Sequence, residues 1–184
     1  MMRIATEADL PGVLAIYAPY VTNSTASFEY TVPTEAEFTH RFQTITAQVP
    51  WLVWEEDGCI LGYAYASAPF ERAAYRWCAE PSIYLAPQAQ GKGIGRKLYA
   101  VLEDILQRQG YRLLYAIITS ENAGSLAFHE KLGYRHLALF PGCGYKQGKH
   151  LGVVWMEKEL EFGGYPSGFP KAWNEIVEIN QKFR

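Results

Sequence analysis

The chain has 184 residues, of which 49% are hydrophobic, and it carries a formal net charge of −2 with an isoelectric point near 6.1. A chain of this length and apolar content fits one domain with a substantial buried core. Its 17 Lys and Arg residues are scattered along the sequence, so a nucleic acid, a membrane or an anionic polymer is not expected as a partner.

The first half of the chain alternates short apolar segments with two amphipathic stretches. In chain order it predicts a strand at 3–5, a helix at 10–18, a segment without helical period at 24–32, a helix from about 33 to 48, and strands at 51–55 and 59–68. Thr34 followed by Glu35 and Glu37 is typical of a helix start. Asp57-Gly58 between the last two strands indicates a tight hairpin turn.

The second half continues the alternation of strands and helices. In chain order it predicts a strand at 77–85, a helix at 95–109, a strand at 111–119, a helix at 122–132, and strands at 135–140 and 151–160. The nearly continuous apolar run at 111–119 favours a strand covered on both faces. A compositional break at 163–168 separates a single main domain, residues 1–162, from a C-terminal extension, residues 163–184, in which a helix is predicted at 171–182.

Three glycines stand between the strand at 77–85 and the next helix, in the sequence Gln88-Ala-Gln-Gly-Lys-Gly-Ile-Gly-Arg96. A helix start offers unpaired N–H groups and a positive dipole end, and glycines let a phosphate approach them without a Cβ in the way. The nucleotide P-loop is excluded because Gly93 follows Lys92, and the dinucleotide fingerprint because Arg96 stands where its third glycine would be. Taken alone, the segment is either a phosphate site or a plain connecting turn.

The pattern Gln90-x-x-Gly93-x-Gly95 resembles the pyrophosphate loop of the GNAT acetyltransferases, which bind acetyl-CoA. A second motif, Asn122-Ala-Gly-Ser-Leu-Ala-Phe-His-Glu-Lys-Leu-Gly-Tyr134, follows at the spacing of that family. It predicts a short helix with Asn122 as N-cap. The resemblance implies an α/β (α+β) GNAT acyl-CoA N-acyltransferase fold, with a mixed, mostly antiparallel central sheet flanked by helices, and acetyl-CoA as co-substrate.

His129 stands where most GNAT enzymes have the tyrosine that is assigned as general acid for the thiolate of CoA. With this histidine, the segments at 77–87 and 145–155 resemble the phosphinothricin and methionine sulfoximine acetyltransferases, and the likeness extends over residues 3–160. The resemblance therefore implies transfer of acetyl from acetyl-CoA to the α-amine of a small amino-acid-like compound.

The family's cofactor contacts carry over residue by residue. Ile83, Tyr84 and Leu85 would pair with the pantetheine arm through their backbone, and Leu85 or a neighbour would donate an N–H to the oxyanion. The pyrophosphate would lie against Gln90, Gly91, Lys92, Gly93, Ile94, Gly95 and Arg96, although the two basic side chains are as readily solvated. Asn122 and Ser125 would contact the pantetheine or adenylate portion, unless Asn122 acts only as a helix cap.

Glu80 is the candidate general base, because it stands mid-strand among apolar neighbours and an ammonium must lose a proton before its nitrogen attacks. By strand alternation one face carries Arg76, Cys78, Glu80, Ser82 and Tyr84. The alternatives are a solvent-facing carboxylate or an ion pair with Arg76, although four residues span roughly 13 Å along a strand. Pro81 cannot donate to a sheet and favours a bulge that would reset this alternation.

His129 is the second catalytic candidate. Its imidazole could stabilise or protonate the leaving thiolate, or hold a water with Glu80, and a purely structural role is the alternative. For the acceptor, Arg76 is expected to bind carboxylate, phosphinate or sulfoximine oxygens, unless it faces solvent. Phe28 and Tyr30 resemble the subfamily's substrate loop and are expected to pack against a short side chain.

Two other functions stay open. One is acetylation of another small amine or of a protein N-terminus, and the other is an acyl-CoA-binding module without catalysis, against which Glu80 and His129 argue. The resemblance also suggests a homodimer with the active site near the interface.

The cysteines and the apolar segments bear on metal binding and location. Cys59, Cys78 and Cys143 lack the spacing of a zinc or redox site, so we expect reduced thiols and no metal. The first residues lack the apolar core of a signal peptide, and no apolar run reaches membrane-spanning length. These features predict a cytoplasmic protein.

Overall fold

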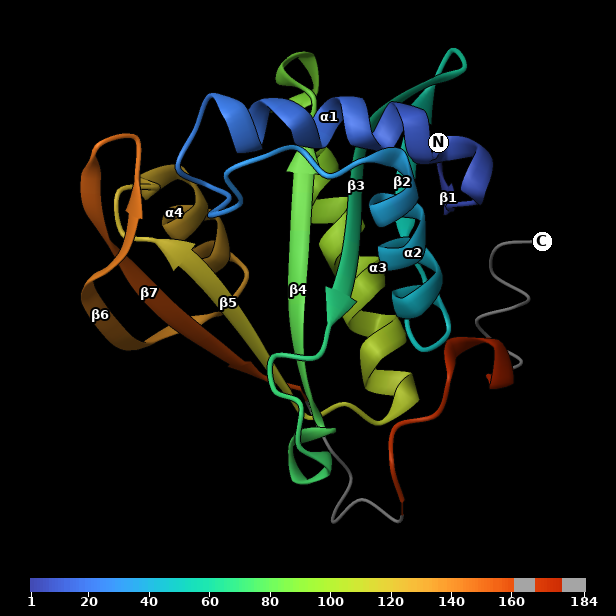
Figure 1. Cartoon of the computed structure of the whole chain (residues 1–184). Coiled ribbons are helices and arrows are strands. Elements are labelled where there is room, and N and C mark those ends of the chain that lie inside the picture. The colour runs from blue at the N-terminus through green and yellow to red at the C-terminus, as the bar shows by residue number, and fades with distance from the viewer. Residues whose placement is uncertain (161–167, 177–184) are drawn as a thin grey trace.

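The computed structural model describes residues 1–160 and 168–176. Within them, seven strands form one mixed sheet in the order β1-β2-β3-β4-β5-β7-β6 (Figure 1). The strands are β1 (Met2–Ile4), β2 (Leu52–Glu56), β3 (Cys59–Ser67), β4 (Cys78–Leu85), β5 (Leu113–Thr119), β6 (Arg135–Lys146) and β7 (Lys149–Glu159). The α-helices are α1 (Leu10–Thr22), α2 (Glu35–Thr46), α3 (Ile94–Gln109) and α4 (Ala123–Lys131). The predicted fold class is confirmed.

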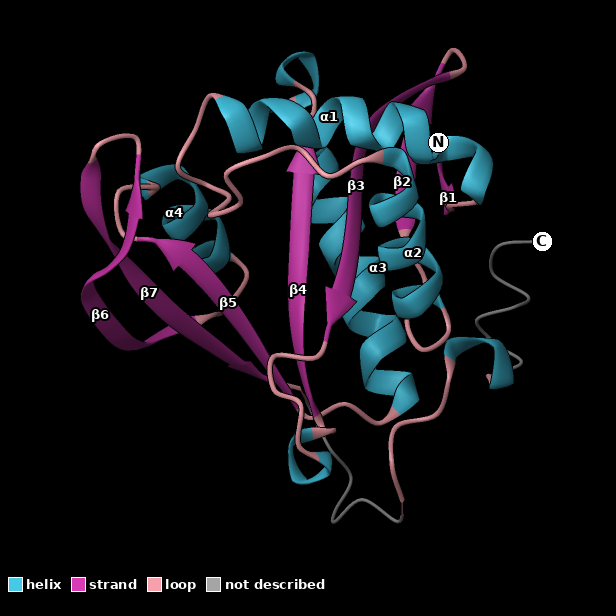
Figure 2. Cartoon of the chain, viewed as in Figure 1, coloured by secondary structure: helices cyan, strands magenta, loops and turns pink. Residues whose placement is uncertain are grey.

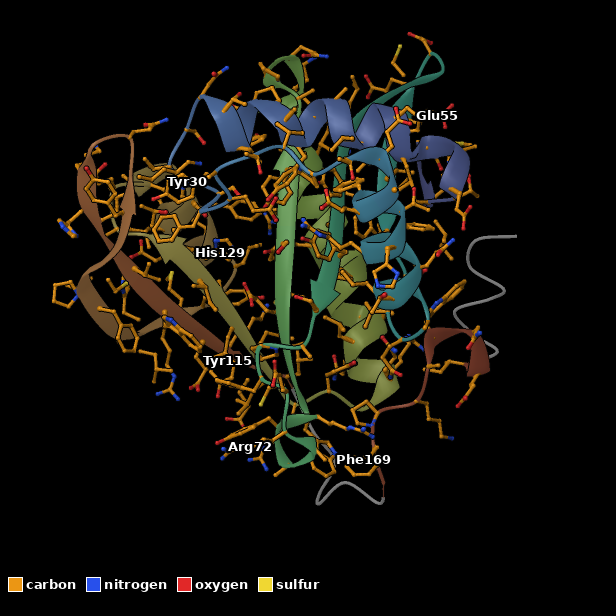
Figure 3. The ribbon with its side chains drawn as sticks, in the orientation of Figure 1. Tyr30, Glu55, Arg72, Tyr115, His129 and Phe169 are labelled. Carbon is orange, nitrogen blue, oxygen red and sulfur yellow. The ribbon has the colours of Figure 1, made fainter. Side chains whose placement is uncertain are left out.

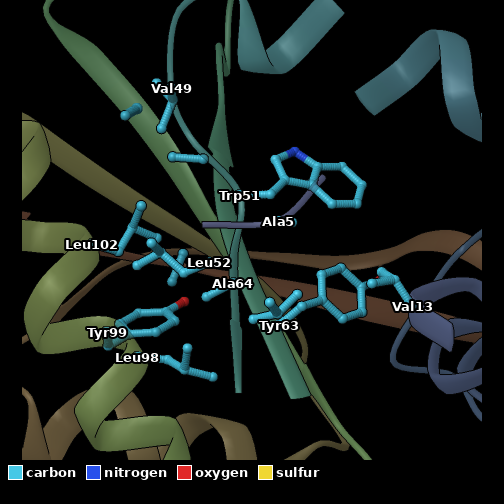
Figure 4. Packing of buried hydrophobic residues seen from close by; sticks show 14 of the residues in the cluster. Ala5, Val13, Val49, Trp51, Leu52, Tyr63, Ala64, Leu98, Tyr99 and Leu102 are labelled. Carbon is cyan, nitrogen blue, oxygen red and sulfur yellow. The ribbon is translucent and has the colours of Figure 1, made fainter. Parts of the chain in front are cut away.

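The helices cover the sheet from two sides. Helices α1 and α2 lie on one face of the β2–β4 region and α3 lies on the other, while α4 covers β5 on the same side as α3 (Figures 1 and 2). In Figure 4, Trp51, Tyr63 and Val13 pack on one side of the strands, and Leu98 and Leu102 of α3 pack on the other. All five are buried, so the sheet is the middle layer of the core.

Local signals in the sequence set most of the element boundaries. The Thr34 hydroxyl accepts from the backbone N–H of Glu37, whose carboxylate accepts from the backbone N–H of Thr34, which closes a capping box at the start of α2. Asp57 and Gly58 both have positive φ, as a two-residue hairpin turn between β2 and β3 requires. These predicted features are confirmed.

One helix and one strand extend further than the sequence predicts. Helix α1 continues through Pro19 to Thr22, because Val21 is buried and the Tyr20 hydroxyl bonds to Leu85, contacts that outweigh one missing backbone hydrogen bond. Strand β6 continues through Pro141, with a register shift there. A proline is tolerated at that point because β6 is the edge strand of the sheet.

The expected coverage of β5 on both faces is wrong for one of them. Leu114 and Ala116 are buried, but Ile117, on the opposite face, is 36% exposed. Most side chains on that second face are only partly covered because neither α1 nor α2 reaches over β5 (Figure 1). The apolar run therefore includes residues that border an open region.

Strands β4 and β5 separate soon after they begin. They are the one parallel pair in the described sheet, and they pair only at Cys78 with Leu113 and Ala79 with Leu114. Beyond that point β4 continues for six residues, to Leu85, paired with β3 alone. The divergence is visible in Figure 1, where the two arrows point away from each other. The split leaves backbone groups of β4 without a strand partner on one side.

The described part of the C-terminal extension packs on the ends of α2 and α3. The indole N–H of Trp173 donates to the carbonyl of Thr46, and the backbone N–H of Lys171 donates to Gln109. Within the helix expected at 171–182, Trp173–Glu175 forms a short 3-10 turn, and residues 177–182 lie outside the described residues. The expected boundary at 162 also lies outside them, so the domain division stays a prediction.

Two further observations concern the whole described chain. All three cysteines are free thiols. No helix among residues 1–160 and 168–176 is long and apolar enough to cross a membrane.

Candidate active site

A cavity of about 750 Å³ occupies the split between β4 and β5. Its walls come from β4 and β5, from α1 and the segment that follows it, and from the starts of α3 and α4. The site residues predicted from sequence that line it are Phe28, Glu80, Ile83, Tyr84, Leu85, Gln90, Gly91, Gly95, Asn122, Ser125 and His129. Those that do not line it are Tyr30, Arg76, Lys92, Gly93, Ile94 and Arg96.

Strand β4 presents alternate residues to the two sides of the sheet. The Tyr84 ring packs edge-on against Tyr17 and Tyr20 of α1. A Cβ added to Gly95 of α3 would lie 3.2 Å from the side chain of Ile83. Even-numbered side chains of β4 therefore face α1, and odd-numbered ones face α3.

Glu80 belongs to the even-numbered set and so lies on the α1 face. Burial raises the pKa of Glu80 to about 6. Its carboxylate forms neither a hydrogen bond nor an ion pair with any residue that the structure describes. A buried carboxylate without a partner binds a proton readily and is free to take one from a ligand.

The bulge expected at Pro81 is absent. The register between β3 and β4 is continuous from Gly62 opposite Leu85 to Ser67 opposite Glu80. The backbone N–H of Ala86 donates to β3, so even positions of β4 bond to β3 and odd positions turn toward the split. The nitrogen of Pro81 faces the split, where no strand would have accepted a hydrogen bond.

Arg76 lies apart from the cavity. The expectation that it shares the Glu80 face is wrong, because Arg76 caps a short 3-10 turn at 73–75 and β4 begins only at Cys78. Its guanidinium carbon lies 4.9 Å from the centre of the Phe169 ring. Figure 3 places Phe169 beside the beginning of β4. The glycine loop, residues 88–96, follows the other end of this strand. The assignment of Arg76 to the acceptor stays a prediction.

His129 approaches the cavity from the α3 and α4 side. It is 4% exposed, its Nδ1 lies 2.8 Å from the carbonyl oxygen of Ser125, and its Nε2 lies 2.9 Å from the Tyr99 hydroxyl. Burial lowers the pKa of His129. Both ring nitrogens are thus engaged within the protein, and the sequence alone pointed to neither partner in this role.

The glycine loop is shaped to receive an anion. Gly91 and Gly93 both have a φ of 73°, and a Cβ on either would meet no atom within 4 Å. Gly93 is the N-cap of α3 and provides no side-chain cap, so first-turn N–H groups remain for a ligand. Lys92 and Arg96 are exposed and do not line the cavity. The loop therefore fits a pyrophosphate without any side chain in the way.

Gly95 allows close packing at the same place. Its neighbours leave little room for a side chain, since an added Cβ would lie 3.4 Å from Leu85, 3.5 Å from Phe128 and 3.2 Å from Ile83, which would have to shift by a few tenths of an ångström. A larger residue would push α3 away from β4. The third glycine thus holds the helix start against the strand that borders the cavity.

Tyr20, for which the sequence gives no functional signal, forms hydrogen bonds to the last residue of β4. Its hydroxyl donates to the carbonyl of Leu85 over 2.7 Å and accepts from the N–H of Leu85 over 3.3 Å. The Gln90 amide lies 3.4 Å from the same hydroxyl. The backbone N–H of Leu85, which is expected from the sequence to donate to the oxyanion, thus donates to Tyr20 in this structure. The backbone of Ile83 has no strand partner on the split side.

The start of α4 forms the opposite wall. The Asn122 side chain accepts from the backbone N–H of Ser125 over 3.1 Å, which is the expected helix cap. Asn122, Ser125 and Phe128 all line the cavity. Capping and ligand contact are therefore compatible at Asn122, and the assignment of ligand contacts stays a prediction.

The segment at 23–33 forms the outer wall and is tied to the β6–β7 hairpin. The Lys146 ammonium is buried and donates to the carbonyls of Val21 and Ser27. The Phe28 ring fills the space beside Gly144, where an added Cβ would lie 2.2 Å from it. The Tyr30 hydroxyl bonds to the backbone of the same hairpin, and Figure 3 places Tyr30 at that side, 68% exposed.

The described side chains that line the cavity carry two carboxylates, Glu29 and Glu80, and neither Lys nor Arg. Glu29 is paired with Arg41 at 2.7 Å. The wall is thus suited to an ammonium group. Among the described residues there is no group of three side chains that could hold a metal ion.

The chain is similar to known acetyltransferases over most of its length. The family model of the acetyltransferase (GNAT) domain matches residues 2–155. Phosphinothricin N-acetyltransferase of Alcaligenes faecalis is 38% identical over 164 residues, 88% of this chain and 83% of that protein. L-methionine sulfoximine/L-methionine sulfone acetyltransferase of Pseudomonas aeruginosa is 37% identical over 164 residues, 87% and 94% of the two chains. The crystal structure of a GNAT superfamily phosphinothricin acetyltransferase from Sinorhizobium meliloti in complex with AcCoA has a TM-score of 0.85 and 38% identity, covering 92% of this chain and 97% of that one.

Proposed function

Since the chain belongs to the GNAT acetyltransferase family, we propose that it acetylates the α-amine of a small amino-acid-like compound of the phosphinothricin or methionine sulfoximine and sulfone type. It is an acetyl-CoA-dependent N-acetyltransferase. The substrate class follows the activities for which the relatives are named. The single observation that carries the chemistry is the partly buried Glu80 carboxylate, which has no hydrogen-bond or ion-pair partner among the described residues and lies in the cavity wall.

The residues at the split fit acetyl-CoA. The N–H groups at the start of α3 and the open turn at Gly91 and Gly93 would hold the pyrophosphate. The backbone of Ile83, which has no strand partner on the split side, would pair with the pantetheine arm. Acetyl-CoA supplies an acetyl group activated as a thioester.

Glu80 serves as the general base. The incoming amine is mostly protonated near neutral pH, so a carboxylate must remove its proton before the nitrogen can attack. A pKa of about 6 leaves Glu80 ionised at neutral pH while making it a stronger base than a solvent-exposed glutamate. The proton passes from the ammonium to Glu80, directly or through a water.

The two reactants reach the split from opposite sides. Glu80 lies on the α1 face with Phe28 and Glu29 nearby in the same cavity wall, whereas His129 lies on the α3 and α4 face with the glycine loop. The acceptor amine would therefore enter beside Glu80, and the sulfur would leave on the His129 side. This division separates removal of a proton from the amine and delivery of a proton to the thiolate.

The carboxylate, phosphinate or sulfoximine oxygens of the acceptor need a cationic donor. The described cavity wall carries no Lys or Arg, so this donor would come from outside it. Arg76 is the proposed donor, and it would act after its loop changes position or from a partner subunit. Phe28 and Tyr30 would pack against the acceptor side chain. Of the two, Phe28 is the better supported because it lines the cavity.

A homodimer is proposed as well. Strand β6 is an edge strand of 12 residues, and it exposes Leu137, Leu139, Phe140 and Tyr145. Long exposed apolar edges are normally covered by a partner. A cytoplasmic location is proposed too, and the three free thiols are compatible with it.

The proposal is tested by release of free thiol from acetyl-CoA with a panel of amines. The panel holds phosphinothricin, methionine sulfoximine, methionine sulfone, ordinary amino acids, polyamines and a peptide with a free N-terminus. Preferential turnover of the first three supports the proposed substrate class. Turnover of polyamine or peptide alone would replace it by the alternative acceptors, and binding of acetyl-CoA without turnover of any amine would favour a non-catalytic module.

A further inference from the structure

A tyrosine of α3 stands between β4 and His129. The Tyr99 hydroxyl lies 2.9 Å from Nε2 of His129 and 3.2 Å from the carbonyl oxygen of Pro81. The residue is 1% exposed, yet it lines the cavity between β4 and β5. Its hydroxyl is therefore a polar group at the inner wall of the site, with two partners that differ in chemistry.

The hydrogen bond between His129 and Ser125 determines which group donates in the contact between Tyr99 and His129. The Ser125 carbonyl can only accept, so Nδ1 of His129 carries a hydrogen. In the neutral imidazole Nε2 then has a free lone pair, and Tyr99 donates to it. In the imidazolium, Nε2 donates to the Tyr99 oxygen instead.

The Pro81 carbonyl can accept the hydrogen bond of the Tyr99 hydroxyl when His129 becomes protonated. Odd positions of β4 face the split, where β5 has already diverged, and the Pro81 oxygen accepts from Tyr99. When Nε2 of His129 donates to Tyr99, the hydroxyl hydrogen can turn to Pro81. The hydroxyl thus keeps its place in both protonation states of the histidine.

The position of His129 argues against direct donation by the imidazole. One nitrogen is committed to the Ser125 carbonyl and the other points at the Tyr99 oxygen. A proton on Nε2 therefore leaves the ring through Tyr99. The Tyr99 hydroxyl is then the group through which a proton from His129 reaches the cavity.

We propose that Tyr99 donates the proton to the departing thiolate and that His129 replaces it. The proposal rests on the proposed acetyl transfer. The sulfur keeps the electron pair of its broken bond to the acetyl carbon, and Tyr99 gives its O–H proton to that sulfur. His129 then passes the proton on Nε2 to the tyrosinate and becomes neutral, with its hydrogen on Nδ1, and it recovers a proton through solvent before the next turnover.

The test compares three variants of the full chain. Tyr99→Phe is expected to lower kcat by about 10²-fold or more, the range of a lost general acid, and to leave KM for acetyl-CoA unchanged. His129→Phe is expected to cost less, because Tyr99 keeps its hydroxyl and the Pro81 contact. Tyr134→Phe is the matched control, since its ring also packs on His129 but does not line the cavity, and it is expected to keep kcat.

Two outcomes in turnover would overturn the proposal. One is a kcat of Tyr99→Phe within about twofold of the starting enzyme, too small for loss of an acid. The other is a larger loss in His129→Phe than in Tyr99→Phe, which would make the imidazole the donor. Binding of acetyl-CoA by calorimetry shows whether each variant is folded.

Nitrogen NMR of the unliganded protein tests the contact independently of activity. At alkaline pH, where His129 is neutral, its hydrogen should appear on Nδ1, and the Nε2 resonance should move in Tyr99→Phe and not in Tyr134→Phe. An unmoved Nε2 would contradict the proposal even if turnover fell. Absence of turnover in the starting protein would instead count against the acetyl transfer on which the proposal rests.

A variant that keeps the hydroxyl covers the case in which Tyr99→Phe fails to fold. With 3-fluorotyrosine at position 99, which has a more acidic phenol, kcat should change while KM for acetyl-CoA stays the same. The ionisable groups that face Tyr99 are His129 of α4, Glu80 of β4, Glu103 of α3, Tyr65 of β3 and Tyr134. None of them is replaced in this variant, so an unchanged kcat would contradict the proposal.

Discussion

The Glu80 carboxylate and the His129 imidazole reach one cavity from opposite faces of the sheet. Glu80 shares the side of β4 that packs on α1, and His129 meets the side that packs on α3 through Tyr99. The two faces communicate only because β4 and β5 stop pairing after their first two residue pairs. The proposed removal of one proton and delivery of another therefore take place in different layers of the fold.

Replacement of Glu80 by glutamine is expected to stabilise the protein at alkaline pH. The folded-state pKa of about 6 lies above the ordinary value of 4.5, so the ionised carboxylate opposes folding above pH 6, and this cost disappears below the ordinary value. Glu80→Gln should raise the free energy of unfolding near pH 8 by about 1–2 kcal/mol and leave it unchanged near pH 4. Thermal melts at both pH values measure it.

Glu71→Gln is the control for this stability prediction, because Glu71 is exposed on the loop before β4. It should leave the melting temperature unchanged at both pH values. Equal effects of the two substitutions, or a destabilised Glu80→Gln at alkaline pH, would contradict the assignment of a partly buried and unpaired carboxylate.

The left-handed glycine at the start of α3 is expected to be needed for the cofactor. Gly93→Ala strains a residue at φ 73°, and Gly58→Ala, in the β2–β3 turn, strains one at φ 75°, with open space around both. Each should cost about 1 kcal/mol of stability. Only Gly93→Ala should raise KM for acetyl-CoA, by about tenfold if one charge-assisted hydrogen bond is lost. Equal KM values for acetyl-CoA in the two variants would contradict the proposal that the loop at Gly93 binds the cofactor.

The buried lysine of the β6–β7 hairpin is expected to hold the outer wall. Lys146→Met would leave the carbonyls of Val21 and Ser27 without a donor and cost about 1–3 kcal/mol. Because the segment carrying Phe28 would loosen, KM for the amine should rise while KM for acetyl-CoA stays the same. Both constants come from steady-state kinetics.

Lys149→Met is the matched control for this substitution. Lys149 lies in the same hairpin, but it is exposed and pairs with Glu121 at the surface, where a single ion pair contributes little. It should change neither constant. A Lys146→Met enzyme with an unchanged KM for the amine would show that the wall does not contact the acceptor.

Features set by neighbouring residues could be predicted from the sequence. The capping box at Thr34, the turn at Asp57 and the Asn122 cap each depend on a few adjacent residues. The place of Glu80 in the cavity wall could be predicted as well, because a carboxylate within an apolar strand is unusual. Its role as general base stays a proposal.

Features that depend on distant contacts could not be predicted. Tyr20, Tyr99 and Lys146 look like ordinary helix or strand residues, and only the fold brings their polar atoms to β4, to His129 and to the segment after α1. Arg76 was misplaced because strand alternation was extended past the true beginning of β4. The expected bulge at Pro81 was wrong because the split leaves that nitrogen without a strand to bond.

The measurement that tests the account most directly is the pH dependence of turnover in Glu80→Gln with the best amine of the panel. The account predicts that kcat falls by about 10²–10⁴-fold, that binding of acetyl-CoA is unchanged, and that the rise in activity through about pH 6 expected of the starting enzyme is lost. A variant that kept the original kcat and the same rise near that pH would contradict the assignment of Glu80 as the base.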